Sequence, residues 1–334
     1  MRDACRRHSA TNRLGHHHGN RQPWQADRCD RRIGAAMTRS VTVLTNPMAG
    51  GGRAGHAGRS AVARLREREL HVTTIEGRTP GDALTLLEKA VGSGTEAVVA
   101  VGGDGLVNLV VQVLADTDVP MGLIPAGTGN DLARTLGLPL DDPARAADIV
   151  ADNVTRAIDL GRTGERWFAT VLSSGFDSLV TERAIRLRWP RGPLRYNAAM
   201  MLQLASLRKL PYVIELDDAE LRLDATLVAV GNGRSYGGGM VVCPAARVDD
   251  GLLDVTVVRG VSRTRLLTLS PTLYRGTHID LPEVDTYTST QVTLRCDGII
   301  AYADGERVAE LPVTARCVPR ALRVFVDRGS APRG

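Results

Sequence analysis

The sequence predicts an α/β protein with an N-terminal, doubly wound parallel sheet and a second, β-sandwich-like domain. Two observations support this fold class. Between residues 41 and 157, β-rich runs alternate with helical stretches, which is typical of βαβ units in a parallel sheet. From about residue 159 the pattern changes to β-rich segments separated by turn residues, which is typical of a sandwich. A chain of 334 residues is long enough for two such domains.

Three β-rich runs of the N-terminal half each lead into a glycine-rich loop and then a helical stretch. The runs are 40–44, 97–100 and 121–124. The carboxyl ends of parallel strands meet at one edge of a sheet, where ligands bind. Glycine turns at helix N-termini let backbone N–H groups approach phosphate oxygens closely. The N-terminal domain is therefore predicted to bind a nucleotide, although each turn by itself is also compatible with a packing role.

The second loop, Gly102-Gly103-Asp104-Gly105, contains a carboxylate. An aspartate in a phosphate-binding turn suits a Mg²⁺ ion that bridges phosphate oxygens, or an attacking hydroxyl group that must be oriented. In the third loop, Thr128 lies between two glycines, so that its hydroxyl can reach a phosphate. These loops therefore predict nucleotide chemistry.

Two turns of the β-rich half contain paired carboxylates. Asp249-Asp250-Gly251 and Asp304-Gly305-Glu306 both fit ordinary tight turns, the second a type I′ hairpin. Oxygen-rich turns also bind Mg²⁺ through one carboxylate, backbone carbonyls and water. A carboxylate can likewise accept the proton of an alcohol that attacks a phosphate. Structural and functional interpretations both remain open for these two turns.

Composition limits the class of protein. No run of 18 uninterrupted apolar residues exists, so no membrane-spanning helix is expected. Five scattered cysteines without Cys-x-x-Cys spacing argue against a zinc site and fit a reducing, cytoplasmic compartment. Aromatic residues make up only 4% of the chain, which argues against nucleic-acid binding.

Residues 1–36 differ from the rest of the chain. They contain eight arginines against three aspartates, which accounts for the whole net charge of +5. They show no hydrophobic periodicity and no apolar segment of a secretory signal. We expect a disordered or mis-assigned extension, with domains at 37–158 and 159–328.

A basic segment with interleaved apolar residues runs from 182 to 209. It contains seven Arg or Lys residues against the single Glu182, together with Trp189 and several Leu and Met residues. Such a segment could dock on an anionic bilayer. A helix with one buried apolar face and one solvated basic face explains the pattern equally well.

The three glycine loops, in this order and spacing, resemble the diacylglycerol kinase catalytic domain family of lipid kinases. The family includes bacterial soluble diacylglycerol kinases and sphingosine and ceramide kinases, and NAD kinases share the Gly-Gly-Asp-Gly element on a similar fold. The resemblance covers roughly residues 37–328. It implies an ATP-dependent, Mg²⁺-requiring kinase that phosphorylates the primary hydroxyl of a membrane lipid, most simply diacylglycerol to phosphatidic acid, at the cytoplasmic membrane face. A homodimer stays open.

The resemblance also assigns roles to particular residues. Glu306 is the favoured catalytic base, Asp304 is its competitor or partner, and Asp104 helps to organise Mg²⁺. A structural Mg²⁺ is implied at Asp250 with the backbone oxygens of Arg247 and Leu252. The residues implied to bind the nucleotide are Asn46, Pro47, Gly50, Thr79, Gly102, Gly103, Asp104, Gly105, Asn108, Gly127, Thr128, Gly129 and Asn130. From local sequence alone, Thr79 reads as the first hydroxyl of a helix.

Three positions depart from the bacterial family pattern. Leu106 replaces threonine, as in the sphingosine kinase branch, Leu109 replaces an acidic residue, and Ala49 replaces serine. The alternatives are therefore a sphingosine-type kinase, an NAD kinase-like enzyme, and a non-catalytic lipid-binding relative. Burial of Asp104 away from the cleft between the domains would favour the last of these.

Overall fold

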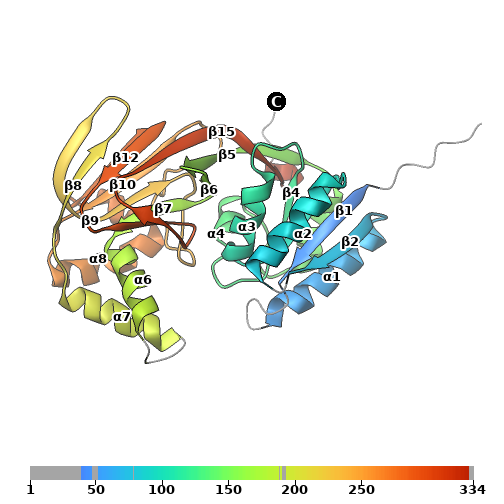
Figure 1. The fold of residues 1–334 in the computed structure, drawn as a ribbon, viewed down its shortest axis with the longest axis horizontal. Coiled ribbons are helices and arrows are strands. Elements are labelled where there is room, and N and C mark those ends of the chain that lie inside the picture. Colours follow the sequence, from blue (N-terminus) through green and yellow to red (C-terminus); the bar gives the residue numbers. More distant parts are fainter. Residues whose placement is uncertain (1–38, 47–51, 78, 188, 190–192, 331–334) are drawn as a thin grey trace, which may run out of the picture. The chain divides into compact units, whose positions relative to one another are not determined.

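The computed structural model describes residues 39–46, 52–77, 79–187, 189 and 193–330 (Figure 1). The predictions for residues 1–36, Pro47 and Gly50 lie outside these ranges. The helices are α1 Arg53–Glu67, α2 Pro80–Gly92, α3 Asp104–Leu114, α4 Asp131–Thr135, α5 Pro143–Ala151, α6 Phe176–Arg186, α7 Pro193–Ala205 and α8 Arg263–Arg275. The strands are β1 Ser40–Thr45, β2 His71–Glu76, β3 Ala97–Gly102, β4 Met121–Pro125, β5 Thr155–Thr163, β6 Arg166–Phe168, β7 Val171–Gly175, β8 Leu210–Glu215, β9 Glu220–Gly231, β10 Leu253–Arg259, β11 Val284–Ser289, β12 Gln291–Arg295, β13 Ile300–Ala303, β14 Glu306–Glu310 and β15 Val313–Phe325.

The first four strands form a parallel sheet in the order β2-β1-β3-β4. Strands β3 and β4 are buried along their whole length, as expected for strands covered on both faces. Right-handed connections in this strand order place α1 on one face and α2 and α3 on the other, and α5 packs beside α1. The direction of winding changes between β1 and β3, which is where ligands bind in such sheets.

The remaining strands are mainly antiparallel and continue the same sheet. Strands β14, β13, β7, β9, β8, β12 and β15 follow one another, while β10 and β11 extend from β9, and β5 and β6 extend from β15. Their apolar residues form a second core. Strand β15 joins the two regions because it pairs antiparallel with β12 and β5 and parallel with β4 at Val324 and Met121.

The predicted fold class is confirmed, with local differences. The β-rich pattern of residues 307–315 predicts one strand, but the structure divides it into β14 and β15 around Pro312, which lacks the N–H that a ladder needs. The sequence pattern predicts a helix over residues 61–70, whereas α1 begins eight residues earlier, at Arg53, because small residues at 54, 57 and 61 bury its first turns. The predicted domain boundary at 158/159 falls inside β5 and stays a prediction.

None of the helices within the described ranges has both the length and the apolar character needed to cross a bilayer.

Candidate active site

Two cavities meet at Asp104 and Thr128, which line both of them. The larger, of about 810 Å³, lies beside the carboxyl ends of β1 and β3 and is also lined by Glu306. The smaller, of about 440 Å³, is bordered by Asp131, Asp177 and Asp304. Two ligands held in these cavities would therefore meet beside one carboxylate.

The larger cavity brings together most of the residues predicted to bind a nucleotide. Its lining includes Asn46, Thr79, Gly103, Asp104, Gly105, Asn108, Gly127 and Thr128. Thr79 is the N-cap of α2, and its Oγ1 accepts a hydrogen bond from the backbone N–H of Asp82 at 3.2 Å. Leu84, Leu106 and Leu109 give this cavity an apolar wall.

The Asp104 carboxylate holds the third glycine loop. Its Oδ2 accepts the backbone N–H of Asn130 at 2.9 Å, and its Oδ1 accepts that of Asp131 at 2.7 Å. Burial is the main cause that raises the pKa of Asp104, and the charge of Asp131 adds to it, while the two backbone hydrogen bonds oppose the rise. Each oxygen keeps a further acceptor position. A Cβ atom on Gly129 would lie 2.2 Å from Oδ2, so only glycine fits there.

Three predicted residues lie around the larger cavity without lining it. Gly129 lines the smaller cavity instead, whereas Asn130 and Gly102 line neither. The Asn130 side chain bonds both backbone groups of Gly127, at 3.0 and 3.2 Å, and so closes the loop on itself. Asn130 can therefore act on a ligand only through the shape of the loop.

Asp131, which the sequence analysis did not select as a site residue, ties this loop to the β-rich region. Its carboxylate accepts hydrogen bonds from Ser235 Oγ and from the backbone N–H groups of Gly238 and Gly239, at 2.9–3.0 Å. The only sequence signal was its place directly after the third glycine loop, Gly127-Thr128-Gly129-Asn130. Gly237 and Gly238 line the smaller cavity, and the buried Asp131 carboxylate fixes this segment through Gly238 and Gly239.

The Asp304-Gly305-Glu306 turn is the predicted type I′ hairpin, since Asp304 and Gly305 have φ values of 50° and 85°. Asp304 accepts four hydrogen bonds: from the backbone N–H of Ala169 (2.8 Å), from the backbone N–H and hydroxyl of Thr170 (2.9 and 2.5 Å), and from Asn108 Nδ2 (3.3 Å). These bonds fill its acceptor capacity. Glu306 is exposed and has no hydrogen bond with any residue that the structure describes.

Asp177, at the start of α6, is a buried carboxylate of the smaller cavity that the sequence analysis missed. Its Oδ2 accepts a hydrogen bond from the Tyr236 hydroxyl at 3.1 Å. Its Oδ1 has no hydrogen-bond partner among the described residues. Burial raises the pKa of Asp177, and its hydrogen bonds only partly oppose this. Nothing in the local sequence distinguishes it from an acidic residue in the first turn of any helix.

The turn predicted to hold a structural Mg²⁺ lies outside both cavities. Asp250 is exposed and accepts the backbone N–H of Leu252 at 3.1 Å, and neither Arg247 nor Leu252 lines a cavity. Burial and the charge of Asp250 raise the pKa of Asp254 to about 6. In the described part of the chain, no three His, Cys, Asp or Glu side chains form a metal-binding group. A cation here would depend on Asp250 and backbone oxygens.

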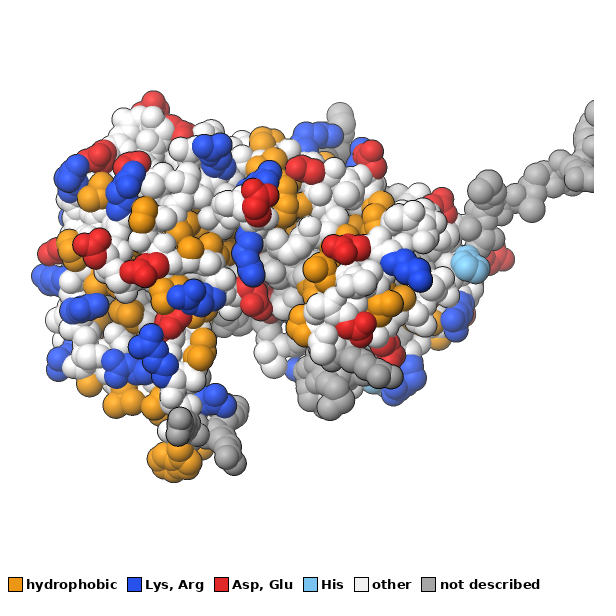
Figure 2. Space-filling model, in the orientation of Figure 1, with side chains coloured by type: hydrophobic (Ala, Val, Ile, Leu, Met, Phe, Trp, Pro, Cys, Tyr) orange, Lys and Arg blue, Asp and Glu red, His pale blue; other side chains and the backbone are white. Residues whose placement is uncertain are grey.

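Helices α6 and α7 present hydrophobic and basic side chains together (Figure 2). Exposed fractions are 65% for Ile185, 81% for Trp189, 64% for Leu194 and 63% for Met201. Arg183 joins the two helices through Gln203 and Ser206, at 3.0 and 3.1 Å.

The same helix pair is connected to the Asp304-Gly305-Glu306 hairpin. Glu182 Oε1 accepts hydrogen bonds from the Tyr302 hydroxyl at 2.8 Å and from Arg307 Nε at 3.1 Å. Burial by itself would raise the pKa of Glu182. These hydrogen bonds act in the opposite direction and help to lower that pKa below its usual value.

Comparisons with known proteins agree with this architecture. Residues 40–163 match the diacylglycerol kinase catalytic domain, and residues 170–326 match the YegS C-terminal NAD kinase beta sandwich-like domain. A Mycobacterium tuberculosis protein named diacylglycerol kinase is 50% identical over 294 residues, which cover 86% of this chain and 95% of that protein. A probable YegS-like lipid kinase of Pseudomonas aeruginosa is 31% identical over 275 residues, covering 81% and 90%.

Solved structures share the fold. A putative diacylglycerol kinase of Bacillus anthracis superposes with a TM-score of 0.73 at 21% identity, covering 87% of this chain and 98% of that one. An Archaeoglobus fulgidus NAD kinase, solved with ATP, gives 0.52 at 12% identity, covering 87% and 95%.

Proposed function

The chain belongs to the family of bacterial diacylglycerol kinases and YegS-like lipid kinases. We propose that it transfers the γ-phosphate of ATP to the primary hydroxyl of diacylglycerol. The junction of two cavities at Asp104 is the observation that best supports a two-substrate reaction there. We assign ATP to the larger cavity and the lipid headgroup to the smaller one.

The larger cavity suits ATP in both shape and chemistry. Its glycine turns supply backbone N–H groups and helix N-termini for the phosphates. Its apolar wall suits the adenine ring. Within this proposal, Asn46, Thr79, Gly103, Gly105, Gly127 and Thr128 contact the nucleotide, while Gly102, Asn108, Gly129 and Asn130 shape the surrounding loops. Pro47 and Gly50 keep the nucleotide-binding role that the family resemblance implies.

Glu306 is the proposed general base. In the reaction it accepts the hydroxyl proton while the lipid oxygen bonds to the γ-phosphorus, and the bond from that phosphorus to ADP breaks. The four hydrogen bonds of Asp304 support a structural role for this carboxylate, which fixes the hairpin and thereby places Glu306. Asp177, with its unpartnered Oδ1, is the proposed contact of the lipid headgroup.

Mg²⁺ is part of the proposal, at two places. Bound beside Asp104, it would neutralise charge on the transferred phosphate. The free acceptor positions of Asp104 support this assignment. The second ion, at Asp250 with the carbonyl oxygens of Arg247 and Leu252, is supported by the mutual repulsion of Asp250 and Asp254, which a cation would relieve.

We also propose that the α6–α7 surface docks on an anionic membrane at the cytoplasmic face. Its exposed apolar side chains suit the interfacial region of a bilayer, and its arginines suit anionic headgroups. A homodimer remains a prediction.

The alternatives receive less support. Likeness to an NAD kinase at 12% identity shows the fold alone. A non-catalytic relative was expected to bury Asp104 away from the cleft, whereas Asp104 lines both cavities. The phosphate-transfer experiment described next distinguishes a sphingosine-type acceptor from diacylglycerol.

The test is transfer of labelled γ-phosphate from ATP, with Mg²⁺, to diacylglycerol, sphingosine or NAD in mixed micelles. We expect transfer to diacylglycerol, lost in Glu306→Gln and retained in Glu310→Gln, which removes a carboxylate from the far end of the same strand. Transfer to sphingosine or NAD alone would replace the proposed acceptor. No transfer to any acceptor by a folded protein would overturn the proposal.

A further inference from the structure

Arg166, at the start of β6, is a cation in a cavity whose other charged residues are acidic. Among the described residues that line the larger cavity, Asp104 and Glu306 are negative and only Arg166 is positive. Its guanidinium has no hydrogen bond or ion pair with any residue that the structure describes. A polyanionic ligand placed between two carboxylates needs such a charge, since backbone N–H groups supply only partial ones.

Helix α3 of the parallel-sheet region fixes the position of Arg166 through the neighbouring residue. The next residue, Trp167, exchanges two hydrogen bonds with the amide of Gln112: its N–H donates to Oε1 at 3.0 Å, and its carbonyl accepts from Nε2 at 2.9 Å. Gln112 lies on α3, which begins at Asp104. The short β5–β6 hairpin that presents Arg166 is therefore attached to the helix that begins at the glycine turn.

Arg162, on the same hairpin, is an arginine with a structural role. Arg162 donates to the Gly164 carbonyl at 3.1 Å, pairs with Glu165 at 3.2 Å, and lies 4.9 Å from the centre of the Trp167 ring. Arg166 makes none of these contacts, so the fold does not explain an arginine at that position.

We propose that Arg166 binds the terminal phosphates of the nucleotide, so that the β-rich region contributes a phosphate ligand, in addition to Glu306, to a cavity lined mainly by the parallel-sheet region. This inference rests on the assignment of ATP to the larger cavity. The planar guanidinium fork matches two phosphate oxygens at once. Since Glu306 lines the same cavity, Arg166 acts at the reacting end of the phosphate chain.

The experiment compares binding of Mg²⁺-ATP, ADP, AMP and adenosine by calorimetry. The variants are Arg166→Ala, Arg166→Lys and Arg323→Ala, the last of which removes the same charge from a strand outside the cavity. Loss of a charge-assisted, bidentate contact should weaken ATP binding about 10- to 100-fold. ADP binding should weaken less, and AMP and adenosine binding should not change. Arg166→Lys should restore part of the loss, and Arg323→Ala should match the unmodified protein.

Three results would contradict the inference. Unchanged ATP binding by Arg166→Ala would overturn the inference. An equal loss for ATP and adenosine would overturn it too, because it would indicate a distorted cavity. If the unmodified protein binds no ATP, the assignment of the cavity fails, and the role of Arg166 fails with it.

Discussion

The two regions that build the site use their polar groups in opposite ways. In the parallel-sheet region, Asp104, Asn130 and Asp131 accept hydrogen bonds from backbone N–H groups and so fix the glycine loops. In the antiparallel region, Glu306 and Arg166 lack partners among the described residues, and Asp177 has one unpartnered oxygen.

The parallel-sheet region therefore contributes mainly shaped backbone, and the antiparallel region contributes reactive side chains. Asp304 and Glu306 show both uses within one turn, because the first is saturated with hydrogen bonds and the second has none among the described residues. Substitutions of saturated carboxylates should change stability first. Substitutions of exposed, unpartnered groups should change chemistry while stability stays the same.

The largest effect is expected from Glu306→Gln. Loss of a general base should lower kcat by roughly 10²- to 10⁴-fold. The free energy of unfolding should change by less than about 0.5 kcal/mol, because the side chain is exposed. Kinetics in micelles and urea unfolding measure the two quantities. A large loss of stability with kcat preserved would erase the contrast between the two carboxylates of the turn.

Asp304→Ala should give the reverse order of effects. It leaves the N–H groups of Ala169 and Thr170 and the amide of Asn108 without their acceptor, which should cost roughly 2–4 kcal/mol in unfolding free energy. Activity should then fall because the hairpin moves. Urea unfolding checks this, with Glu306→Gln as the matched control. Equal stability of the two variants would count against the structural role of Asp304.

Asp177→Asn tests the unpartnered carboxylate through pH. Because burial raises the pKa of Asp177, the folded protein keeps this proton at pH values where the unfolded chain has lost it. Stability from this group is therefore complete below the ordinary aspartate pKa of about 3.9 and is lost as pH rises through the folded pKa, by up to about 1.4 kcal/mol per pH unit. The asparagine variant should gain stability relative to the unmodified protein over that rise. Parallel curves of Tm against pH would show that Asp177 is ionised in the fold.

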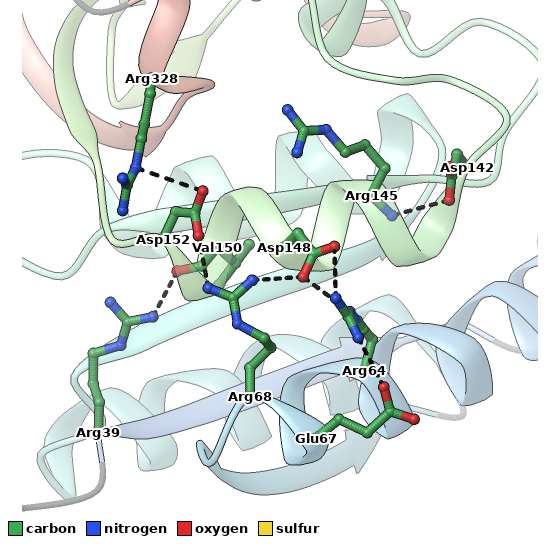
Figure 3. A network of polar contacts seen from close by, with 10 residues as sticks. All are labelled: Arg39, Arg64, Glu67, Arg68, Asp142, Arg145, Asp148, Val150, Asp152 and Arg328. Atoms are coloured by element: carbon green, nitrogen blue, oxygen red, sulfur yellow. Dashed lines mark hydrogen bonds and ion pairs between the residues drawn. The ribbon is translucent and has the colours of Figure 1, made fainter.

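The smallest effects are expected in the arginine network that joins α1, α5 and the residues after β15 (Figure 3). Asp148 accepts hydrogen bonds from Arg64 and Arg68 at 2.6–3.2 Å, whereas Arg328 lies 3.6 Å from Asp152 and is 71% exposed. Asp148→Ala should lower stability less than Asp304→Ala, and Arg328→Ala should change it least of all. The Asp148→Ala loss should shrink at about 1 M salt. Neither variant should alter activity.

The sequence predicts the parallel-sheet region well because its functional residues directly follow strand ends, and strand order then brings them together. Asn46, Gly103 and Thr128 line one cavity for that reason. The sequence could not distinguish the roles of Asp304 and Glu306, since the structural role of Asp304 depends on its hydrogen bonds with Thr170, 134 residues earlier in the chain. Arg166 was missed likewise, because the bond between its neighbour and Gln112, which helps to place it, joins residues 55 positions apart in the chain.

Strand β15 affects when the parallel-sheet region can fold during synthesis. Its last residues, Leu322, Val324 and Phe325, are buried in the same core as β1, β3 and β4, although about 200 residues separate them from β4. A nascent chain therefore cannot complete its first core until β15 has left the ribosome. We expect residues 40–163, expressed alone, to expose that apolar edge and aggregate.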